Sequence, residues 1–178
     1  MDNPPASPDR PGRQSDDEAH PYRLPTLGAR GEGWVLIQSA LLSAVIAAGI
    51  FGASWPERAR YARLAAAATL GAVGTFLVVA GSVSLGRELT PMPRPHARSV
   101  LKQTGIYARV RHPIYGGVIL TAFAWSFVMS PWALIPSATV PILFNLKAKL
   151  EEEWLAERFP EYPNYARRVR HRFVPNLW

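Results

Sequence analysis

The sequence predicts an all-α, polytopic membrane protein with about four transmembrane helices and a cytoplasmic C-terminal helical segment. The first observation behind this prediction is that three stretches of the 178-residue chain, 33–56, 64–86 and 113–146, contain no Asp, Glu, Lys or Arg. Each stretch exceeds the roughly 18 apolar residues that are needed to cross a bilayer. The second observation is that Lys and Arg gather in the segments between and after these stretches. A free-standing soluble enzyme or DNA-binding domain is therefore excluded.

The chain begins with a compositionally separate segment, residues 1–32. It contains six prolines and an acidic run, Asp16, Asp17 and Glu18, and it has no helical or strand periodicity. Such a segment cannot bury enough apolar surface to offset its conformational entropy. We predict a disordered cytoplasmic tail over 1–32 and one membrane domain over 33–178.

The first two transmembrane helices are predicted over about 33–55 and 64–86. Trp34 and Trp55 lie at the two ends of the first helix, where indole rings favour the membrane interface. The second helix is rich in Ala and Gly, whose small side chains allow a neighbouring helix to approach closely.

The third charge-free stretch, 113–146, is too long for one span, because a single helix of this length would measure about 51 Å. Pro131 lies in its middle, and the residue before a proline disfavours helix. We predict two helices in a tight hairpin, about 114–129 and 132–150, with Pro136 and Pro141 kinking the second.

The distribution of Lys and Arg predicts the orientation. Seventeen of the 20 lie in the N-terminal tail, the segment 87–112 and the C-terminal segment, against three in the loop after the first span. The positive-inside rule then puts both termini in the cytoplasm. Because topology and contact with anionic lipid explain the net charge of +7, nucleic acid is not expected as a partner. The Cys-free, Ala- and Arg-rich composition favours a bacterial inner membrane, and the oligomeric state stays open.

Composition also excludes several chemistries. There is no cysteine, and therefore no disulfide, thiolate zinc site or cysteine nucleophile. The four histidines lack metal-ligand spacing, so no metal site is expected.

A polar, aromatic segment, 105–117, leads into the third span. Pro113 suits the first turn of a helix, because its missing N–H is not needed there. The start of that helix presents free N–H groups to an anion, and Gly116 and Gly117 leave its backbone open to a ligand. The alternative is a membrane-interface belt in which the arginines of the segment bind lipid phosphates.

A second polar segment follows the fourth span and contains Glu151, Glu152, Glu153, Phe159, Tyr162 and Tyr165. Carboxylates at the end of a membrane helix are costly unless they are solvated or paired. Helical spacing puts Glu152 on the same face as Leu155 and Phe159. The alternative is a solvated acidic collar that pairs with nearby arginines.

The run Arg111-His112-Pro113-x-Tyr115-x-Gly117, the acidic pair and Phe-x-x-Tyr-x-x-Tyr together resemble the isoprenylcysteine carboxyl methyltransferase and phospholipid methyltransferase group of membrane enzymes. The resemblance covers about 85–175. It implies S-adenosylmethionine as cofactor, and it implies that the cofactor is bound by Tyr107, His112, Pro113, Tyr115, Gly117, Glu151, Glu152, Tyr162 and Tyr165. It further implies Arg111 and Glu152 as catalytic residues.

The resemblance implies methyl transfer to a lipophilic acceptor from the bilayer, with a carboxylate favoured, as in isoprenylcysteine-like O-methylation. An amine acceptor must lose a proton, which would give Glu152 a general-base role. Carboxylates and aromatic rings suit the cationic parts of S-adenosylmethionine, and an Arg-rich helix start suits its carboxylate. The alternatives are N-methylation of a phospholipid or other amine, a membrane NADPH-dependent reductase and a non-catalytic protein.

Overall fold

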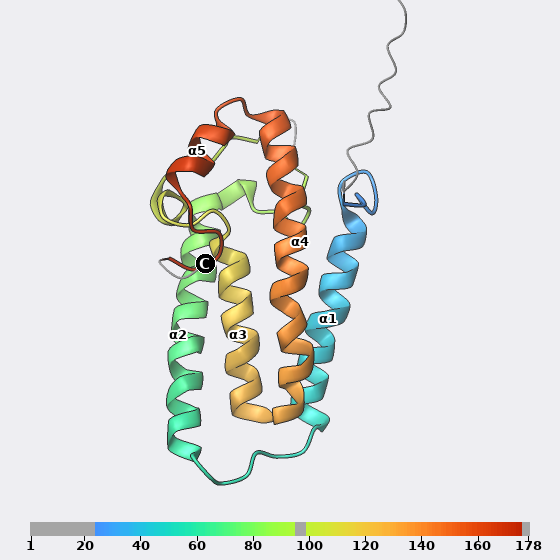
Figure 1. The fold of residues 1–178 in the computed structure, drawn as a ribbon, viewed down its shortest axis with the longest axis vertical. Helices are drawn as coiled ribbons and strands as arrows, with labels where there is room; N and C mark the ends of the chain where they lie inside the picture. Colours follow the sequence, from blue (N-terminus) through green and yellow to red (C-terminus); the bar gives the residue numbers. More distant parts are fainter. Residues whose placement is uncertain (1–23, 95–98, 176–178) are drawn as a thin grey trace, which may run out of the picture.

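The computed structural model describes residues 24–94 and 99–175 (Figure 1). Within these ranges every regular element is a helix, which confirms the predicted all-α class. The α-helices are α1 (Glu32–Phe51), α2 (Arg60–Leu85), α3 (Pro113–Met129), α4 (Leu134–Arg158) and α5 (Tyr162–Arg168). Three short 3-10 helices connect them, η1 (Gly86–Glu88), η2 (Gly105–Ala108) and η3 (Pro131–Ala133).

Most of the predicted disordered tail, residues 1–23, lies outside the described residues. Residues 24–31 form a loop that folds back on α1. Trp34 Nε1 donates a hydrogen bond of 3.0 Å to Pro25 O, and Leu24 packs against the buried cluster that contains Trp34. Because Trp34 is only 5% exposed, it packs inside the protein instead of lying in the lipid-facing belt that its position predicts.

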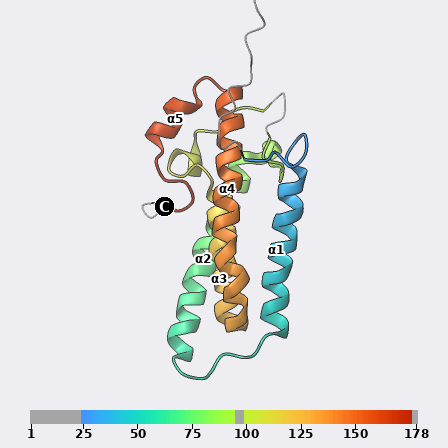
Figure 2. The same cartoon turned by 45° about the vertical axis from the view of Figure 1, so that its right-hand side comes forward.

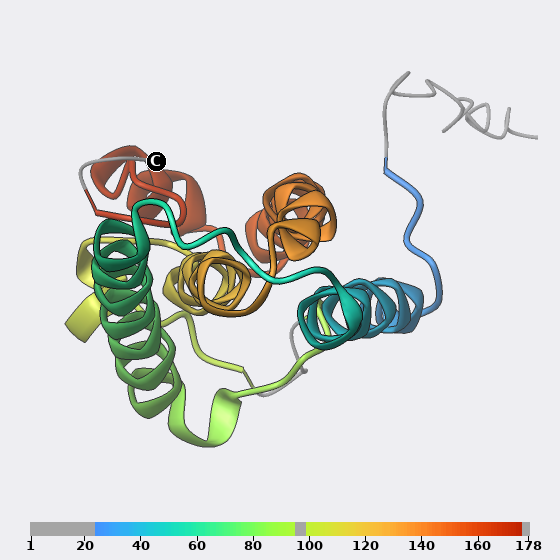
Figure 3. The same cartoon turned by 90° about the horizontal axis from the view of Figure 1, so that it is seen from below.

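The four long helices form a bundle in which α2 lies along α3, and α1 lies along α4 (Figure 3). Glycine makes the closest approach possible, because a Cβ at Gly74 of α2 would lie 2.8 Å from Gly117 O of α3. Helices α3 and α4 are tied in the core by a 2.8 Å hydrogen bond between the Ser126 and Ser137 hydroxyls. The small residues of α2 therefore have the packing role that the sequence predicts.

The predicted hairpin within 113–146 is present. Helix α3 ends at Met129, and η3 leads directly into α4. Helix α4 continues without interruption through Pro141 and past the predicted end at Leu150 to Arg158. The prediction ended this helix too early, because charged residues at 151–153 suggested its exit from the membrane, whereas two of the three carboxylates have partners within the protein.

The loops and turns are sorted between the two ends of the bundle (Figures 1 and 2). The loop before α1, the segments that connect α2 to α3, and α5 lie at one end, whereas the α1–α2 loop and the α3–α4 turn lie at the other. By length and apolar composition, the described residues contain two helices that can cross a membrane, Glu32–Phe51 and Arg60–Glu88. Helix α3 is apolar but shorter.

Candidate active site

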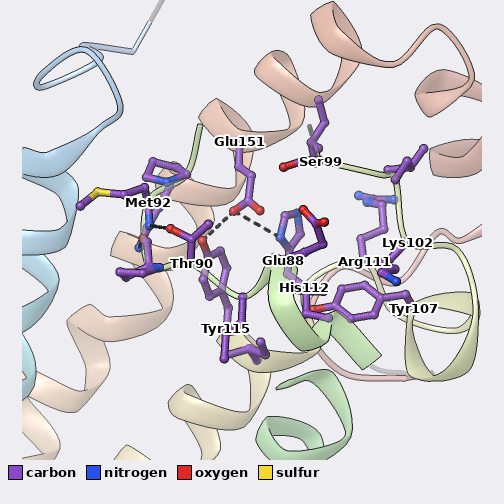
Figure 4. Close-up of a pocket in the computed structure, with 18 of the residues that line it drawn as sticks. Glu88, Thr90, Met92, Ser99, Lys102, Tyr107, Arg111, His112, Tyr115 and Glu151 are labelled. Carbon is purple, nitrogen blue, oxygen red and sulfur yellow. Dashed lines mark hydrogen bonds and ion pairs between the residues drawn. The ribbon is translucent and has the colours of Figure 1, made fainter. Parts of the chain in front are cut away.

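A cavity of about 450 Å³ lies at the end of the bundle that carries α5. Its walls come from α1 to α5, from the segment 88–93 and from the segment 99–107 (Figure 4). Small-molecule sites in proteins have volumes of roughly 300–1,000 Å³. The cavity is therefore large enough for a nucleoside-sized ligand or a lipid head group.

Seven of the ten predicted site residues line this cavity: Tyr107, Arg111, His112, Tyr115, Glu151, Tyr162 and Tyr165. They come from η2, the start of α3, the second half of α4, and α5. The fold therefore brings together two motifs that are separated by some 35 residues of α3 and α4. The remaining three, Pro113, Gly117 and Glu152, are not part of the cavity wall.

Pro113 and Gly117 serve the packing of α3 against α2. Pro113 is the first residue of α3, as predicted, and a Cβ at Gly81 of α2 would lie 3.2 Å from its Cγ. A Cβ at Gly117 would lie 2.5 Å from Gly74 O. A Cβ at Gly116 would clash with the backbone carbonyl of Phe173 near the C-terminus. These glycines therefore admit neighbouring backbone, whereas the sequence had suggested that they admit a ligand.

Glu152 lies in an ion cluster beside the cavity. Its carboxylate accepts hydrogen bonds from Arg111 Nε at 3.0 Å and from Arg172 Nη2 at 2.8 Å, and it lies 3.0 Å from His112 Nε2. Burial raises the pKa of Glu152, but His112, Arg172 and Arg111 outweigh burial and lower the pKa from 4.5 to about 2. A carboxylate held in this way stays ionised near neutral pH, and its low pKa makes it a weak proton acceptor.

Arg111 holds the C-terminal segment, residues 169–172, against the start of α3. Its Nη1 donates to Val169 O at 2.7 Å, and its backbone N–H donates to His171 O at 3.0 Å. The adjacent His112 N–H donates to Arg172 O at 2.7 Å. The Arg111 guanidinium is therefore engaged with protein groups, which contradicts its alternative interpretation as an anchor for lipid phosphate.

Two carboxylates line the cavity, Glu88 and Glu151, and Glu151 is the one that the sequence predicted. Figure 4 shows its side chain directed toward Tyr115 and His112. The Tyr115 hydroxyl donates to Glu151 Oε2 at 2.6 Å, and His112 Nδ1 lies 3.8 Å from the same oxygen. The rings of His112 and Tyr115 stack at 5.3 Å with an interplanar angle of 3°. The sequence left open which glutamate faces the cavity, and the structure distinguishes them, because Glu153 is exposed.

The tyrosines of α5 close the cavity from the C-terminal side. The Tyr165 hydroxyl donates to Tyr107 O at 2.8 Å, and burial raises the pKa of Tyr165 to about 12. The Tyr162 hydroxyl is buried and has no hydrogen-bond partner among the described residues. Burial also raises its pKa, so the hydroxyl keeps its proton near neutral pH. A buried hydroxyl without a partner on a cavity wall is a group that a bound ligand can satisfy.

Sequence reasoning missed Lys147, which it counted among the cytoplasmic charges. Lys147 is only 1% exposed and lines the cavity. The one available signal was its spacing of four residues from Glu151, which puts both side chains on one helix face. The segment 88–93 was also missed as part of the wall, because no local pattern indicates that a loop folds over a helix end.

The fold and the cavity define the class of the protein: a small helical protein with two helices that are long and apolar enough to cross a membrane and a cavity at one end of its bundle. Comparison with family models identifies it further. Residues 62–162, more than half of the chain, match the phospholipid methyltransferase model, so the protein belongs to the phospholipid methyltransferase family. This confirms the resemblance found in the sequence. The comparison with curated proteins finds no match.

Membership implies membrane methyltransferase activity, and the family generally uses S-adenosylmethionine. The matched residues begin in α2 and end at Tyr162, so they include the first motif, the acidic pair and most of the cavity wall, whereas Tyr165 lies outside the match. Helix α1 lies outside the match.

Proposed function

We propose that the protein transfers a methyl group from S-adenosylmethionine to a lipophilic acceptor that enters from the bilayer. The observation that carries this proposal is the make-up of one continuous cavity. One part of its wall is aromatic and acidic, with Glu151, Tyr107 and Tyr162, and another part is apolar, with Val118 and Phe144. Such a cavity can hold a polar cofactor and an apolar substrate against each other.

The residues present fit the cofactor. Glu151 and the faces of the surrounding aromatic rings suit a sulfonium and an ammonium group. The unsatisfied Tyr162 hydroxyl offers a hydrogen bond to a polar ligand. When bound, S-adenosylmethionine supplies a methyl group on a positively charged sulfur, ready for displacement by a nucleophile. We assign its binding to Tyr107, His112, Tyr115, Glu151, Tyr162 and Tyr165.

In such a displacement the protein chiefly holds the nucleophile of the acceptor in line with the methyl group and the sulfur, because correct orientation of reacting groups lowers the barrier strongly. We assign Arg111 and Glu152 to positioning. They hold the C-terminal segment, which directly follows α5, the helix that contains Tyr162 and Tyr165. Pro113 and Gly117 position the start of α3 against α2.

Two acceptor chemistries fit this site. A carboxylate acceptor is already ionised near neutral pH and needs no base. An amine acceptor must first lose a proton, and of the two cavity carboxylates, Glu88 and Glu151, we assign this role to Glu151, which lies beside the proposed cofactor-binding residues His112 and Tyr115. The position of Glu151 favours the amine, because a carboxylate beside the cofactor site attracts an ammonium group and repels an anionic nucleophile at that point of the wall.

We further propose four membrane spans, formed by α1 to α4, with both termini on the cytoplasmic side of a bacterial inner membrane. The gathering of the Arg-rich segments at one end of the bundle supports this orientation. The 17 residues of α3 would extend over about 26 Å, which suits a thin or locally compressed bilayer.

The test uses the full chain in phosphatidylcholine nanodiscs. We expect S-adenosylhomocysteine to raise the melting temperature and NADPH to leave it unchanged. We also expect label from methyl-labelled S-adenosylmethionine to appear in the lipid extract of expressing membranes. Stabilisation by NADPH alone would support a reductase, and no response to either ligand would support a non-catalytic protein. Glu153→Gln, an exposed change on the same helix, is the matched control for Glu151→Gln.

A further inference from the structure

Lys147 is a charged group inside the bundle that the proposed methyl transfer does not use. It lies in α4 and is 1% exposed. Moving an ammonium out of water is costly, and a charge within a membrane protein calls for a partner. The surroundings of Lys147 indicate what that partner is.

The groups in direct contact with the Lys147 ammonium are neutral, and Glu151 acts on it only as a nearby charge. Its Nζ donates to Gln38 Oε1 at 2.6 Å and to Pro91 O at 3.0 Å, and it lies 5.3 Å from the centre of the Tyr115 ring. Within the described ranges 24–94 and 99–175, Lys147 forms no ion pair with a carboxylate. Glu151 lies one turn away from Lys147 on α4, and its carboxylate accepts a hydrogen bond from the Tyr115 hydroxyl instead. An ammonium has three N–H donors, so one remains for a molecule in the cavity.

We propose that Lys147 binds an oxyanion, a carboxylate or phosphate, of a molecule held in the cavity. Gln38 and the Pro91 carbonyl hold the ammonium in place for this purpose. The inference rests on the proposed function and adds a specificity-determining residue to it. Two sources can supply the oxyanion: the head group of the acceptor, or the carboxylate of S-adenosylmethionine.

The position of Lys147 favours the acceptor. Lys147 precedes Glu151 by one helical turn, about 6 Å along the axis, and lies on the side of the apolar residue Phe144, away from α5. A head group that carries a cationic and an anionic group would therefore meet Glu151 and Lys147, which have the matching charges. Gln38 comes from α1, outside the family match, so this support of Lys147 belongs to a part of the chain that the family pattern does not include.

The experiment compares the wild type with Lys147→Met, Lys147→Arg and the control Lys149→Met, which changes an exposed lysine two residues away. Each variant is placed in phosphatidylcholine nanodiscs that contain phosphatidylethanolamine, oleic acid or oleylamine. Methyl transfer to each lipid is followed over a range of lipid concentration. The affinities for S-adenosylhomocysteine and for 5′-methylthioadenosine, which lacks the carboxylate, are measured in parallel. Melting temperatures report whether each variant is folded.

If the acceptor supplies the oxyanion, Lys147→Met lowers kcat/KM for the anion-bearing lipid about ten- to hundredfold. Transfer to oleylamine and the affinity for S-adenosylhomocysteine then stay at the level of Lys149→Met. If the cofactor supplies it, the affinity of Lys147→Met for S-adenosylhomocysteine falls, whereas its affinity for 5′-methylthioadenosine, which lacks the whole amino-acid group, stays at the level of Lys149→Met. In either case Lys147→Arg restores the loss in part.

Two results would overturn the inference. One is a Lys147→Met variant that matches Lys149→Met with every ligand. The other is an equal loss for charged and uncharged ligands together with a lower melting temperature, which would make Lys147 only a structural link between α1 and α4. Failure of the proposed function is separate, because it would appear as a wild type that neither binds S-adenosylhomocysteine nor methylates any lipid.

Discussion

Replacing Glu152 with Gln tests the distinction between the two adjacent carboxylates. Gln keeps the shape of the side chain but removes the charge that faces Arg111, His112 and Arg172. Because Arg111 also binds Val169 O of the C-terminal segment, we expect this segment to open more often. Glu151, on the cavity wall, would keep its hydrogen bond from Tyr115, so the variant should still bind S-adenosylhomocysteine when the segment is closed.

The magnitude follows from the pKa of Glu152. The pKa falls from 4.5 to about 2 in the folded protein, and the side chain is 16% exposed. By linkage, this difference corresponds to about 3 kcal/mol of stabilisation near neutral pH. Because the folded-state pKa is the lower one, the stabilisation is complete above pH 4.5 and is lost as the pH falls toward 2. Of the groups that lower this pKa, only Arg172 belongs to the segment, whereas His112 and Arg111 stay beside Glu152 when the segment opens. The full stabilisation therefore sets an upper bound, and loss of the charge should raise the opening constant of the segment by at most roughly a hundredfold at neutral pH.

The assay is amide hydrogen exchange in nanodiscs. The backbone N–H groups of Arg111 and His112 are the reporters, since they donate to His171 O and Arg172 O across the docked segment. In Glu152→Gln their exchange should be faster at neutral pH, and the wild type should approach the variant only in acid. Glu153→Gln should exchange like the wild type, because Glu153 is exposed. Unchanged exchange together with loss of turnover would refute this reasoning and return Glu152 to the general-base role.

Four further results are expected. Glu151→Gln should weaken binding of S-adenosylhomocysteine about ten- to hundredfold without speeding the exchange of the docked segment; equal affinities in variant and wild type would contradict its place at the site. Tyr162→Phe should leave the melting temperature of the free protein unchanged, because its hydroxyl has no described partner, yet weaken binding of S-adenosylhomocysteine or of the acceptor; unaltered binding of both would show that no ligand uses it. Gly117→Ala should lower the free energy of unfolding by about 1–3 kcal/mol, more than Gly71→Ala, whose Cβ would have an ordinary 3.6 Å contact with its nearest neighbour. A cysteine in place of Trp132, which is 57% exposed in the α3–α4 turn, should react with an impermeant maleimide only from the periplasmic side, and labelling from the cytoplasm would reverse the proposed orientation.

The positions of the helices could be predicted from the sequence, because they depend on local composition. The charge-free stretches and Pro131 predicted α1, α2 and the α3–α4 hairpin. The predicted end of the last long helix, at about 150, differs from that of α4, which continues through Glu151 and Glu152 to Arg158. Their partners, Tyr115 and Arg111, lie about 40 residues earlier in the chain, and no local pattern records such a pairing.

The sequence by itself determined the helical class, the family and the two motifs that form the cavity, because each depends on residue types at short spacing. Only the tertiary structure decided which way each side chain faces. Neighbouring residues on a helix differ by about 100° in direction, so Glu151 reaches the cavity while Glu152 turns into the arginine cluster. Lys147 became a cavity residue only because Gln38 of α1 and the loop at Pro91 fold over it. These contacts join segments that are distant in the sequence. They form only when the whole bundle packs, because packing buries the charged groups and requires them to find partners.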